Sequence, residues 1–394
     1  MRTSVGNMIR VLTLNDISPV GLERLPAEMY QVSDSVSDPD AILLRSFDMH
    51  GYPISKTLKA VARAGAGVNN IPYKSLAARG IPVFNAPGAN AHAVMELTIT
   101  GMLLAARNVA AALDFTADLQ GDDEAITRLV EKGKKEFVGF ELPGRTLGVI
   151  GLGAVGVKVA NTALRLGMRV VGHDPDITVS RAWQLSSEVL QANGVDDLLA
   201  CADVVSVHVP LNDRTRDLID SRGLGIMRHR ATVLNFSRQG IVNDEAIVAA
   251  IDAGKLHAYV CDFPSRRLAG HPRVIALPHI GASTHEAEDK CAVMVADQLR
   301  DYFEEGNVRN SVNFPEVAIP RNEGNRVALV NANVPNMLGQ ISTTLAEAGL
   351  NIIDMLNKSR GEIAYTLADV ESPIPDAVIT KLAAIEGVIA ARSL

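Results

Sequence analysis

The chain has 394 residues, of which 47% are hydrophobic and 21% charged, and its formal net charge is −7 at pH 7. This composition is typical of a packed globular protein with two or three domains and argues against an intrinsically disordered chain. The negative net charge argues against general binding to nucleic acid or to an anionic membrane surface. No apolar run reaches the roughly 18 residues that a membrane-spanning helix needs, so we expect a cytoplasmic protein without a membrane partner.

The first 95 residues alternate short apolar runs with helical stretches, and glycine and proline mark the joints between them. Ala41–Leu44, 58–64 and 81–84 are such runs. Residues 96–112 predict one long apolar helix, and 114–135 form a charged stretch without a strong period. Because the long helix is too apolar for a solvated face, we expect it to pack against a second subunit.

From residue 146 onward the pattern of strand, turn and helix repeats. Apolar strands are predicted at 147–150, 169–172, 203–209, 232–235, 257–261 and 274–277. Short apolar strands that alternate with helices are typical of a parallel sheet covered on both faces. The sequence therefore predicts an α/β fold.

The last part of the chain has a different order of elements. A helix is predicted over 286–305, and 307–325, rich in asparagine, proline and charge, predicts a linker. From 325 the order is strand, helix, strand, strand, helix, strand, which is that of a ferredoxin-like domain. Three cysteines without CxxC spacing are expected to be buried apolar residues, and no metal site is expected; they are Cys201, Cys261 and Cys291.

A nucleotide-binding fingerprint follows the strand 147–150. The segment 151–156 reads G-L-G-A-V-G, a helix is predicted after it, and the next strand ends at the acid Asp174. In this pattern Gly151 allows a tight turn, Gly153 lets a pyrophosphate approach the backbone, and Gly156 lets helix and strand pack closely. The helix N-terminus faces the phosphates. Asp174 accepts hydrogen bonds from a ribose diol and repels a 2′-phosphate, so NAD is favoured over NADP.

Three further motifs stand at the ends of predicted strands. They contain Arg238 in 235–240, Asp262 in 261–264, and His279 in 278–284. Ligands of open α/β sheets bind outside the carboxyl ends of the strands, so we expect these side chains in one crevice. An arginine can hold the carboxylate and keto oxygen of a 2-keto acid, and a histidine can supply the proton that accompanies a hydride.

These motifs, in this order, resemble the signatures of the D-2-hydroxyacid dehydrogenases. The resemblance rests on 151–156, Asp174, 208–211, 235–240 and 278–284, and on 63–70 and 80–87 near the N-terminus, and it covers about residues 8–315. It implies Arg238 and His279 as catalytic residues. It also implies a cofactor-binding set: Gly151, Gly153, Ala154, Val155, Gly156, Asp174, Pro210, Phe236, Asp262 and Gly281.

The chain departs from the family pattern at one catalytic position. The family carries a carboxylate five residues after the aspartate that matches Asp262, where it hydrogen-bonds the histidine and raises the histidine pKa. Here that position is Arg267, and a cation there would lower the pKa. Either another acid takes the role or His279 works with a lower pKa. A smaller departure is Gln239, where the family usually has glycine.

The N-terminal motifs indicate an anionic substrate. Resemblance to the phosphoglycerate-oxidising members of the family implies that Arg63 binds a substrate phosphate, with Arg45 assisting, while the glycine-rich loop binds the carboxylate. The expected substrate-binding set is Arg45, Arg63, Gly65, Ala66, Gly67 and Asn90. A basic run in a neighbouring subunit could also contribute; it contains Lys132, Lys134 and Lys135. The competing interpretation of Arg63 is a surface salt bridge.

The C-terminal region, 325–394, resembles an ACT domain, a small-molecule sensor. The resemblance implies that Asn331, Asn333 and Asn351 bind L-serine at a domain interface, because an asparagine amide both donates and accepts hydrogen bonds. The alternative is that these asparagines form turns. ACT domains pair, so a homodimer or a tetramer is expected.

The expected organisation has three domains. Residues 1–95 and 291–315 form a flavodoxin-like substrate domain, 96–290 a Rossmann-type NAD-binding domain, and 324–394 the ACT-like domain. The leading hypothesis is NAD-dependent oxidation of a small phosphorylated hydroxy acid, D-3-phosphoglycerate. The first alternative is another 2-keto acid reductase, acting on glyoxylate or hydroxypyruvate. The second is a non-catalytic protein that senses NAD(H), which the missing carboxylate favours and the pair Arg238 and His279 disfavours.

Overall fold

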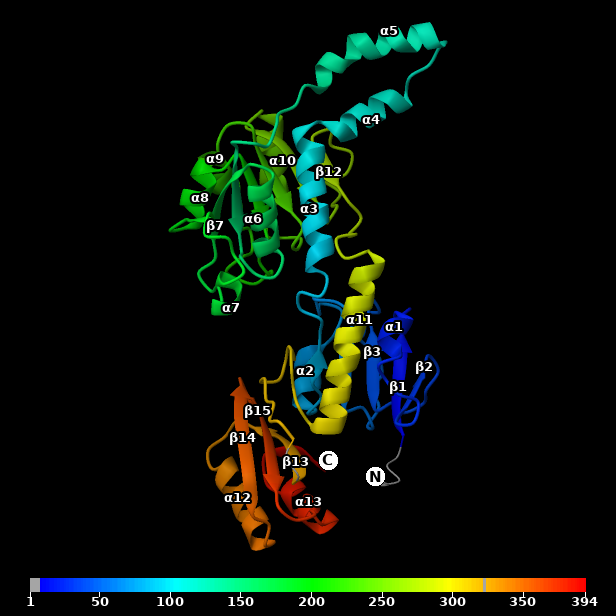
Figure 1. The fold of residues 1–394 in the computed structure, drawn as a ribbon, viewed down its shortest axis with the longest axis vertical. Coiled ribbons are helices and arrows are strands. Elements are labelled where there is room, and N and C mark those ends of the chain that lie inside the picture. Colours follow the sequence, from blue (N-terminus) through cyan, green and yellow to red (C-terminus); the bar gives the residue numbers. More distant parts are fainter. Residues whose placement is uncertain (1–7, 322–323) are drawn as a thin grey trace. The chain divides into compact units, whose positions relative to one another are not determined.

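The computed structural model describes residues 8–321 and 324–394 (Figure 1). The chain divides into two compact units: the first runs up to Asn90 and resumes at His285, and the second is Ala91–Thr284. The first seven residues of the substrate domain predicted from 1 lie outside the described residues. The predicted boundaries inside the first unit, between the substrate and ACT-like domains, stay a prediction.

The first unit contains a five-stranded parallel sheet in the order β2-β1-β3-β4-β5. This is the strand order of flavodoxin-like folds, as the sequence predicts. The long helix α11, His285–Arg300, packs against it and continues into a π-helical turn, Asp301–Glu305. The other elements are β1 Ile9–Leu14, α1 Pro19–Leu22, β2 Tyr30–Ser33, β3 Ala41–Leu44, β4 Ala60–Arg63, α2 Tyr73–Ala78 and β5 Val83–Phe84.

The predicted linker after α11 is a packed segment. Val308, Phe314 and Val317 are almost fully buried in the same core as the parallel sheet. Asn313 accepts a hydrogen bond from the backbone N–H of Val83 at 2.8 Å and donates to two backbone carbonyls. The asparagines that suggest a solvated linker therefore complete the backbone hydrogen bonds beside β5.

The C-terminal residues form an antiparallel sheet in the order β14-β15-β13-β16. Helices α12 and α13 share an apolar core with this sheet, which is the ferredoxin-like arrangement that the sequence predicts. Residues of β13 and β15 also enter the core of the parallel sheet. The bounds are β13 Asn325–Ala332, α12 Met337–Glu347, β14 Ile352–Arg360, β15 Ile363–Val370, α13 Asp376–Ala383 and β16 Val388–Ser393.

A buried ion pair joins the C-terminal sheet to the π-helical turn that follows α11. The guanidinium of Arg326 is fully buried and bonds both carboxylate oxygens of Asp369, at 2.6 and 2.8 Å. The same guanidinium donates to the backbone carbonyls of Glu305, Ile319 and Pro320. Every charge in this pair therefore has a partner, which is the condition under which a buried ion pair is tolerated.

The second unit contains a seven-stranded parallel sheet in the order β12-β11-β10-β9-β6-β7-β8. Its central strands are buried along their whole length, because helices cover both faces. The bounds are β6 Thr146–Ile150, α6 Gly156–Arg165, β7 Arg169–His173, α7 Val179–Ala182, β8 Leu190–Gln191, α8 Val195–Cys201, β9 Val204–Val207, α9 Ser221–Ile226, β10 Ala231–Asn235, α10 Asp244–Asp252, β11 Leu256–Cys261 and β12 Val274–Ala276.

The prediction of one helix over 96–112 is wrong. The chain forms α3, Ala91–Ala106, and α4, Val109–Ala117, which are bent by 68°. The break lies at Asn108, which has the left-handed φ of 50° and donates from its amide to the carbonyl of Val138 at 3.2 Å. Asparagine tolerates this conformation better than other non-glycine residues, and its side chain ties the break to the segment that contains Val138.

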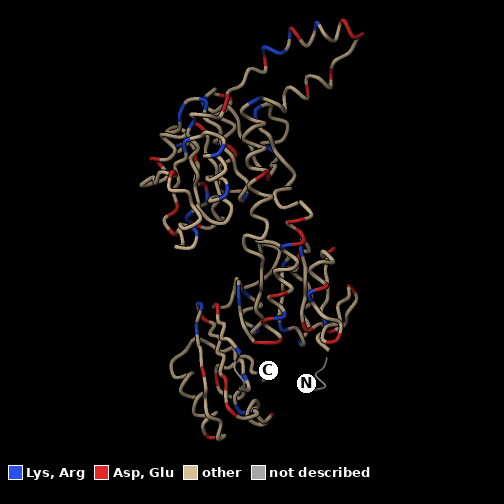
Figure 2. Tube along the Cα trace, viewed as in Figure 1, with Lys and Arg blue, Asp and Glu red and all other residues tan. Residues whose placement is uncertain are grey.

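The charged stretch that follows contains a helix that the sequence analysis missed. Helix α5, Asp123–Gly133, begins after Asp122, whose carboxylate caps the N–H of Ala125 at 2.9 Å. Acidic residues stand in its first turn and Lys132 in its last, which suits the helix dipole. Figure 2 shows Lys and Arg alternating with Asp and Glu along α5. We call α4 and α5 together the arm.

Among the described residues, no single helix is long and apolar enough to span a membrane. The bent pair α3 and α4 meets that test of length and composition only as a pair. Half of the α3 residues are buried inside the second unit, as in the core helix of a packed domain.

The buried pair Arg326–Asp369 predicts a large effect on stability. Asp369→Ala would leave a buried guanidinium without its counter-ion, so the free energy of unfolding should fall by about 3–5 kcal/mol. The control is Arg326→Met combined with Asp369→Leu. This double variant removes both charges, so its free energy of unfolding should decrease by less than that of Asp369→Ala. Urea unfolding followed by circular dichroism measures both. Equal losses in the two proteins would contradict this account.

Candidate active site

The motifs of the second unit lie at one edge of its sheet. Gly151 follows β6, Asp174 follows β7, and Arg238, Asp262 and His279 follow β10, β11 and β12. All seven strands are parallel, so their carboxyl ends share that edge. The strand order reverses direction between β6 and β9, and such a point is where ligands bind in open α/β sheets.

The turn after β6 fits a pyrophosphate. Gly151 has a φ of 92°, and a side chain there would strike the carbonyl of His208. A Cβ at Gly156 would collide with the carbonyl of Gly151, so helix α6 lies close to the turn. A Cβ at Gly153 would meet nothing within 4 Å, and this open backbone is where the fingerprint places the phosphates. Ala154 and Val155 complete the turn, with Val155 at the helix N-cap position.

Asp174 helps to hold this turn in place. Its carboxylate accepts a hydrogen bond from the N–H of Leu152 at 2.8 Å and another from the N–H of Asp176 at 2.9 Å. The side chain is half-buried beside the turn. Each carboxylate oxygen has a second lone pair, so Asp174 can still accept hydrogen bonds from a ribose diol.

A half-buried histidine, which was not among the predicted site residues, lies beside the turn. The ring of His208 bonds the hydroxyl of Ser206 at 2.8 Å, and burial lowers the pKa of His208 to about 4. The imidazole is therefore neutral at physiological pH. Pro210, two residues on, is exposed at the strand end, and its carbonyl accepts from Thr215.

The segment after β10 holds Arg238. The backbone carbonyl of Arg238 accepts from the amide of Asn235 at 2.9 Å, and its guanidinium donates to the carbonyl of Ser237 at 2.6 Å. Burial lowers the pKa of Arg238, although a guanidinium stays charged in proteins. Phe236 is buried in the core against Gly101, so it supports the backbone of this segment.

Asp262 anchors the loop that carries His279. Its buried carboxylate accepts from the N–H of Ile280 at 2.8 Å and from the N–H of Gly281 at 2.7 Å. His279 has a left-handed φ of 56°, an uncommon conformation for a histidine. Its ring packs against Phe263 with centroids 4.9 Å apart. The loop therefore holds the histidine at the strand edge while the imidazole stays exposed.

The predicted substrate residues lie in the first unit. Arg63 ends β4 and pairs in register with Leu44 of β3, directly before Arg45. The guanidinium of Arg63 lies over Gly65, where a Cβ would collide with it. Both arginines are half-buried, and Arg45 forms an ion pair with Glu288 at 2.7 Å.

Side-chain amides fix the backbone of the glycine-rich loop. Asn85 donates to the carbonyl of Ala66 at 2.6 Å, and Asn70 donates to the carbonyls of Arg45 and Phe47 at 3.3 and 2.7 Å. These two asparagines were not among the predicted site residues, although both stand in the motifs 63–70 and 80–87. Gly67 and Asn90 are half-buried in the same unit.

The three predicted regulatory asparagines have different surroundings. Asn331 is 1% exposed, and its amide donates to the carbonyl of Ala332. Asn333 is exposed and bonds the carbonyl of Gly361 at 3.1 Å. Asn351 is exposed before β14 and donates to Glu371 at 2.8 Å. Two of the three are therefore at the surface.

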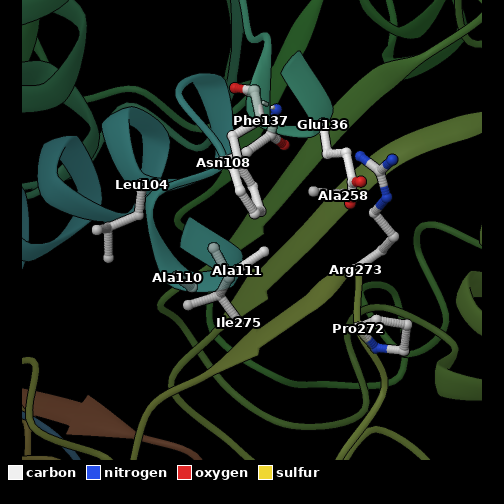
Figure 3. Close-up of a pocket in the computed structure, with 11 residues that line it drawn as sticks. Leu104, Asn108, Ala110, Ala111, Glu136, Phe137, Ala258, Pro272, Arg273 and Ile275 are labelled. Atoms are coloured by element: carbon white, nitrogen blue, oxygen red, sulfur yellow. Dashed lines mark hydrogen bonds between the residues drawn. The ribbon is translucent and has the colours of Figure 1, made fainter. Parts of the chain in front are cut away.

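A cavity of about 190 Å³ lies elsewhere in the second unit (Figure 3). Leu104, Asn108 and Phe137 from the base of the arm line it together with Ala258 and Arg273. Ala258 is near the start of β11 and Arg273 directly precedes β12, so the cavity is not at the strand edge that carries the motifs.

Comparison with known proteins identifies the family. The model for the NAD-binding domain of D-isomer specific 2-hydroxyacid dehydrogenases matches residues 99–281. D-3-phosphoglycerate dehydrogenase of Haemophilus influenzae is 33% identical over 381 residues, which cover 92% of this chain and 88% of that protein. The chain belongs to the D-2-hydroxyacid dehydrogenase family. Its cofactor is NAD, and the Rossmann-type fold predicted for the second unit is confirmed.

The matches to other similar proteins cover different shares of those proteins. The D-3-phosphoglycerate dehydrogenase of Methanocaldococcus jannaschii is 32% identical over 348 residues, and the match covers 86% of this chain but 63% of that protein. Among solved structures, TT0316 of Thermus thermophilus has a TM-score of 0.64 and 26% identity, over 77% of this chain and all of that one. An NAD-bound 3-phosphoglycerate dehydrogenase of Entamoeba histolytica has the same fold, with a TM-score of 0.62 and 24% identity. The match covers 77% of this chain and 98% of that one.

The position where the family has its carboxylate is directed to the protein surface. Arg267 forms an ion pair with Glu245 on α10 at 3.4 Å, and both side chains are more than half exposed. The aspartate that precedes it in the motif, Asp262, uses its oxygens on the backbone of the His279 loop. In this member of the family, the ion-pair partner of Arg267 is therefore a surface glutamate.

The half-buried side chain of His208 predicts that the free energy of unfolding depends on pH. His208 has a pKa of about 4 when folded and an ordinary value of 6.5, so the unfolded chain binds the extra proton between these values. The stabilisation that the neutral His208 gives the folded protein is complete above pH 6.5. As the pH falls to 4, the free energy of unfolding should therefore decrease by up to about 3 kcal/mol. Urea unfolding at pH 7 and pH 4 measures it, with His208→Gln as the reference. An equal pH dependence in both proteins would exclude this role.

Proposed function

We propose that this protein oxidises D-3-phosphoglycerate to 3-phosphohydroxypyruvate with NAD, the first step of L-serine biosynthesis. The observation that carries the proposal is the pair Arg45 and Arg63 at the ends of adjacent parallel strands, beside the glycine-rich loop. Arginine binds phosphate oxygens through paired hydrogen bonds, so two arginines at neighbouring strand ends suit a dianionic phosphate. The relatives named above as D-3-phosphoglycerate dehydrogenases support the same substrate.

The proposed chemistry assigns a role to each group of predicted site residues. In the first unit, Arg63 and Arg45 bind the phosphate, and the loop at Gly65, Ala66 and Gly67 binds the carboxylate through backbone N–H groups. In the second, Arg238 holds the carboxylate and the oxygen on C2 and stabilises the negative charge that develops on that oxygen. His279 takes the hydroxyl proton as general base. NAD, when bound, would be the hydride acceptor. The Gly151–Gly156 turn and Asp174 would hold this cofactor.

The alternatives have different requirements. A reductase of glyoxylate or hydroxypyruvate acts on an unphosphorylated substrate and has no need of Arg63. A protein that only senses NAD(H) has no chemical need of Arg238 together with His279. The proposal therefore includes catalysis with a phosphorylated substrate. The proposed location of this reaction is the cytoplasm.

Arg63→Ala tests the substrate. The KM for 3-phosphohydroxypyruvate should rise by about 100-fold, because charged hydrogen bonds worth roughly 3 kcal/mol are lost, while the rates with hydroxypyruvate stay unchanged. The assay follows NADH oxidation with both substrates. Arg24→Ala is the control, since Arg24 pairs with Asp297 on the same unit and is half exposed. An unchanged KM would favour the unphosphorylated substrates, and no turnover with either would favour the sensor.

The proposed assembly is a homodimer or a tetramer. None of the nine residues of α4 is buried although most are apolar, and Leu113 is 61% exposed. The cavity at the base of the arm adds further apolar surface (Figure 3). Exposed apolar patches of this kind mark protein interfaces, so a second copy of the chain is the proposed cover. A subunit contact through the arm would also bring Lys132, Lys134 and Lys135 toward a partner.

L-serine is the proposed ligand of the C-terminal domain. Asn333 and Asn351 present their amides at the surface near the two ends of the segment that contains α12.

Two measurements test the proposed assembly and the proposed ligand. Sedimentation should give a mass of at least twice the 42.0 kDa of the chain, and calorimetry should detect binding of L-serine to the protein. Asn351→Ala should weaken serine binding by about tenfold, which is the value of one hydrogen bond to a charged group. A monomer, or equal affinity in the variant, would oppose the respective proposal.

A further inference from the structure

The first turn of α11 places an acid against a substrate-binding arginine. Glu288 Oε1 lies 2.7 Å from the NH1 group of Arg45, and about a third of each side chain is exposed. Glu288 comes from the segment after residue 285, and Arg45 from the end of β3. Both belong to the same unit, so this contact does not depend on how the two units are arranged.

One buried thiol, that of Cys291, lies within electrostatic range of the two arginines and the glutamate. Cys291 stands three residues after Glu288 on α11 and is 3% exposed. Burial raises the pKa of Cys291 to about 11, the charges of Arg45 and Arg63 lower it, and the charge of Glu288 raises it. The ion pair with Arg45 therefore places Glu288 beside an arginine that would receive the substrate phosphate, and the charges near Cys291 agree with this placement.

We propose that Glu288 is a positioning residue for the phosphate-binding arginine. Its carboxylate holds one nitrogen of the Arg45 guanidinium and leaves the other donors for a ligand. The proposal rests on the function proposed above, because it takes Arg45 as part of the phosphate site. It assigns a role to a residue outside the motifs that carry the family resemblance.

The physical reason is the flexibility of arginine. A half-exposed arginine at a strand end loses much rotamer freedom when it binds a ligand, and an ion pair that already orders the guanidinium reduces this loss. The same carboxylate also repels a phosphate. Both groups are partly solvated, so that repulsion is screened, whereas ordering acts directly on the group that contacts the ligand.

The neighbouring acid on the same helix provides a matched control. Asp289 carries the same charge, one residue further along α11, but its carboxylate accepts from the hydroxyl of Ser18. Removing either acid changes the net charge equally. Only Glu288 touches Arg45, so the two variants separate positioning from a general change in charge.

Steady-state kinetics with 3-phosphohydroxypyruvate and hydroxypyruvate test the proposal. Glu288→Ala should raise the KM for the phosphorylated substrate by about fivefold to tenfold, with little change in kcat or in the rates with hydroxypyruvate. Glu288→Gln keeps an oxygen acceptor for Arg45 and should restore most of the loss, and Asp289→Ala should behave as the wild type. In an Arg45→Ala background, Glu288→Ala should have no further effect. A lower KM in Glu288→Ala, or an effect that persists without Arg45, would overturn the proposal.

Binding of inorganic phosphate separates this proposal from the proposed function. Calorimetry needs no turnover, and Glu288→Ala should weaken phosphate binding by the same factor as it raises the KM. If the wild type binds phosphate but turns over neither substrate, the proposed function fails while the role of Glu288 is still decided by the variants. If the wild type turns over the phosphorylated substrate and Glu288→Ala is unchanged in both measurements, only the role of Glu288 is excluded.

Discussion

The parallel arrangement of the strands is the constraint on which the rest of the structure depends. In a parallel sheet every carboxyl end falls at the same edge, so residues far apart in the chain, such as Gly151, Asp174, Arg238 and His279, share one edge of the second unit. In the first unit, Arg45 and Arg63 lie at the carboxyl ends of two neighbouring parallel strands for the same reason. Helices on both faces exclude water from the strands, and the polar groups therefore collect where the strands end.

Backbone hydrogen bonds to carboxylates give these strand ends their shapes. Asp174 ties the phosphate turn to β7, and Asp262 ties the loop of His279 to β11. Asp174 accepts from one N–H of the turn and from one N–H just after β7, whereas Asp262 accepts from two N–H groups of the loop. Such charge-assisted bonds are stronger than neutral ones. His279 can therefore occupy a left-handed conformation without glycine at that position.

Helix α11 and the π-helical turn after it pack in one core with strands of both the parallel sheet and the C-terminal sheet. Arg326 bonds carbonyls at and after the end of α11, while Glu288 near the start of α11 contacts Arg45. Tyr365 adds a buried hydrogen bond to the carbonyl of Gly306 at 2.7 Å. A single helix therefore carries contacts to the C-terminal sheet at one end and to the proposed phosphate site at the other. The π-helical turn lies at the end that meets the C-terminal sheet, and such turns are frequent at functional sites.

By itself, the sequence determined the central strands of the second unit, the nucleotide fingerprint and the order of the motifs, because apolar periodicity and glycine spacing are local properties of the chain. It did not determine the break at Asn108 or the packing of 307–325, since both depend on carbonyls and N–H groups that other segments bring close. Nor could it show that Arg267 pairs with Glu245 or that Glu288 pairs with Arg45. A side chain's partner is decided by neighbours distant in sequence, and only the tertiary structure supplies them.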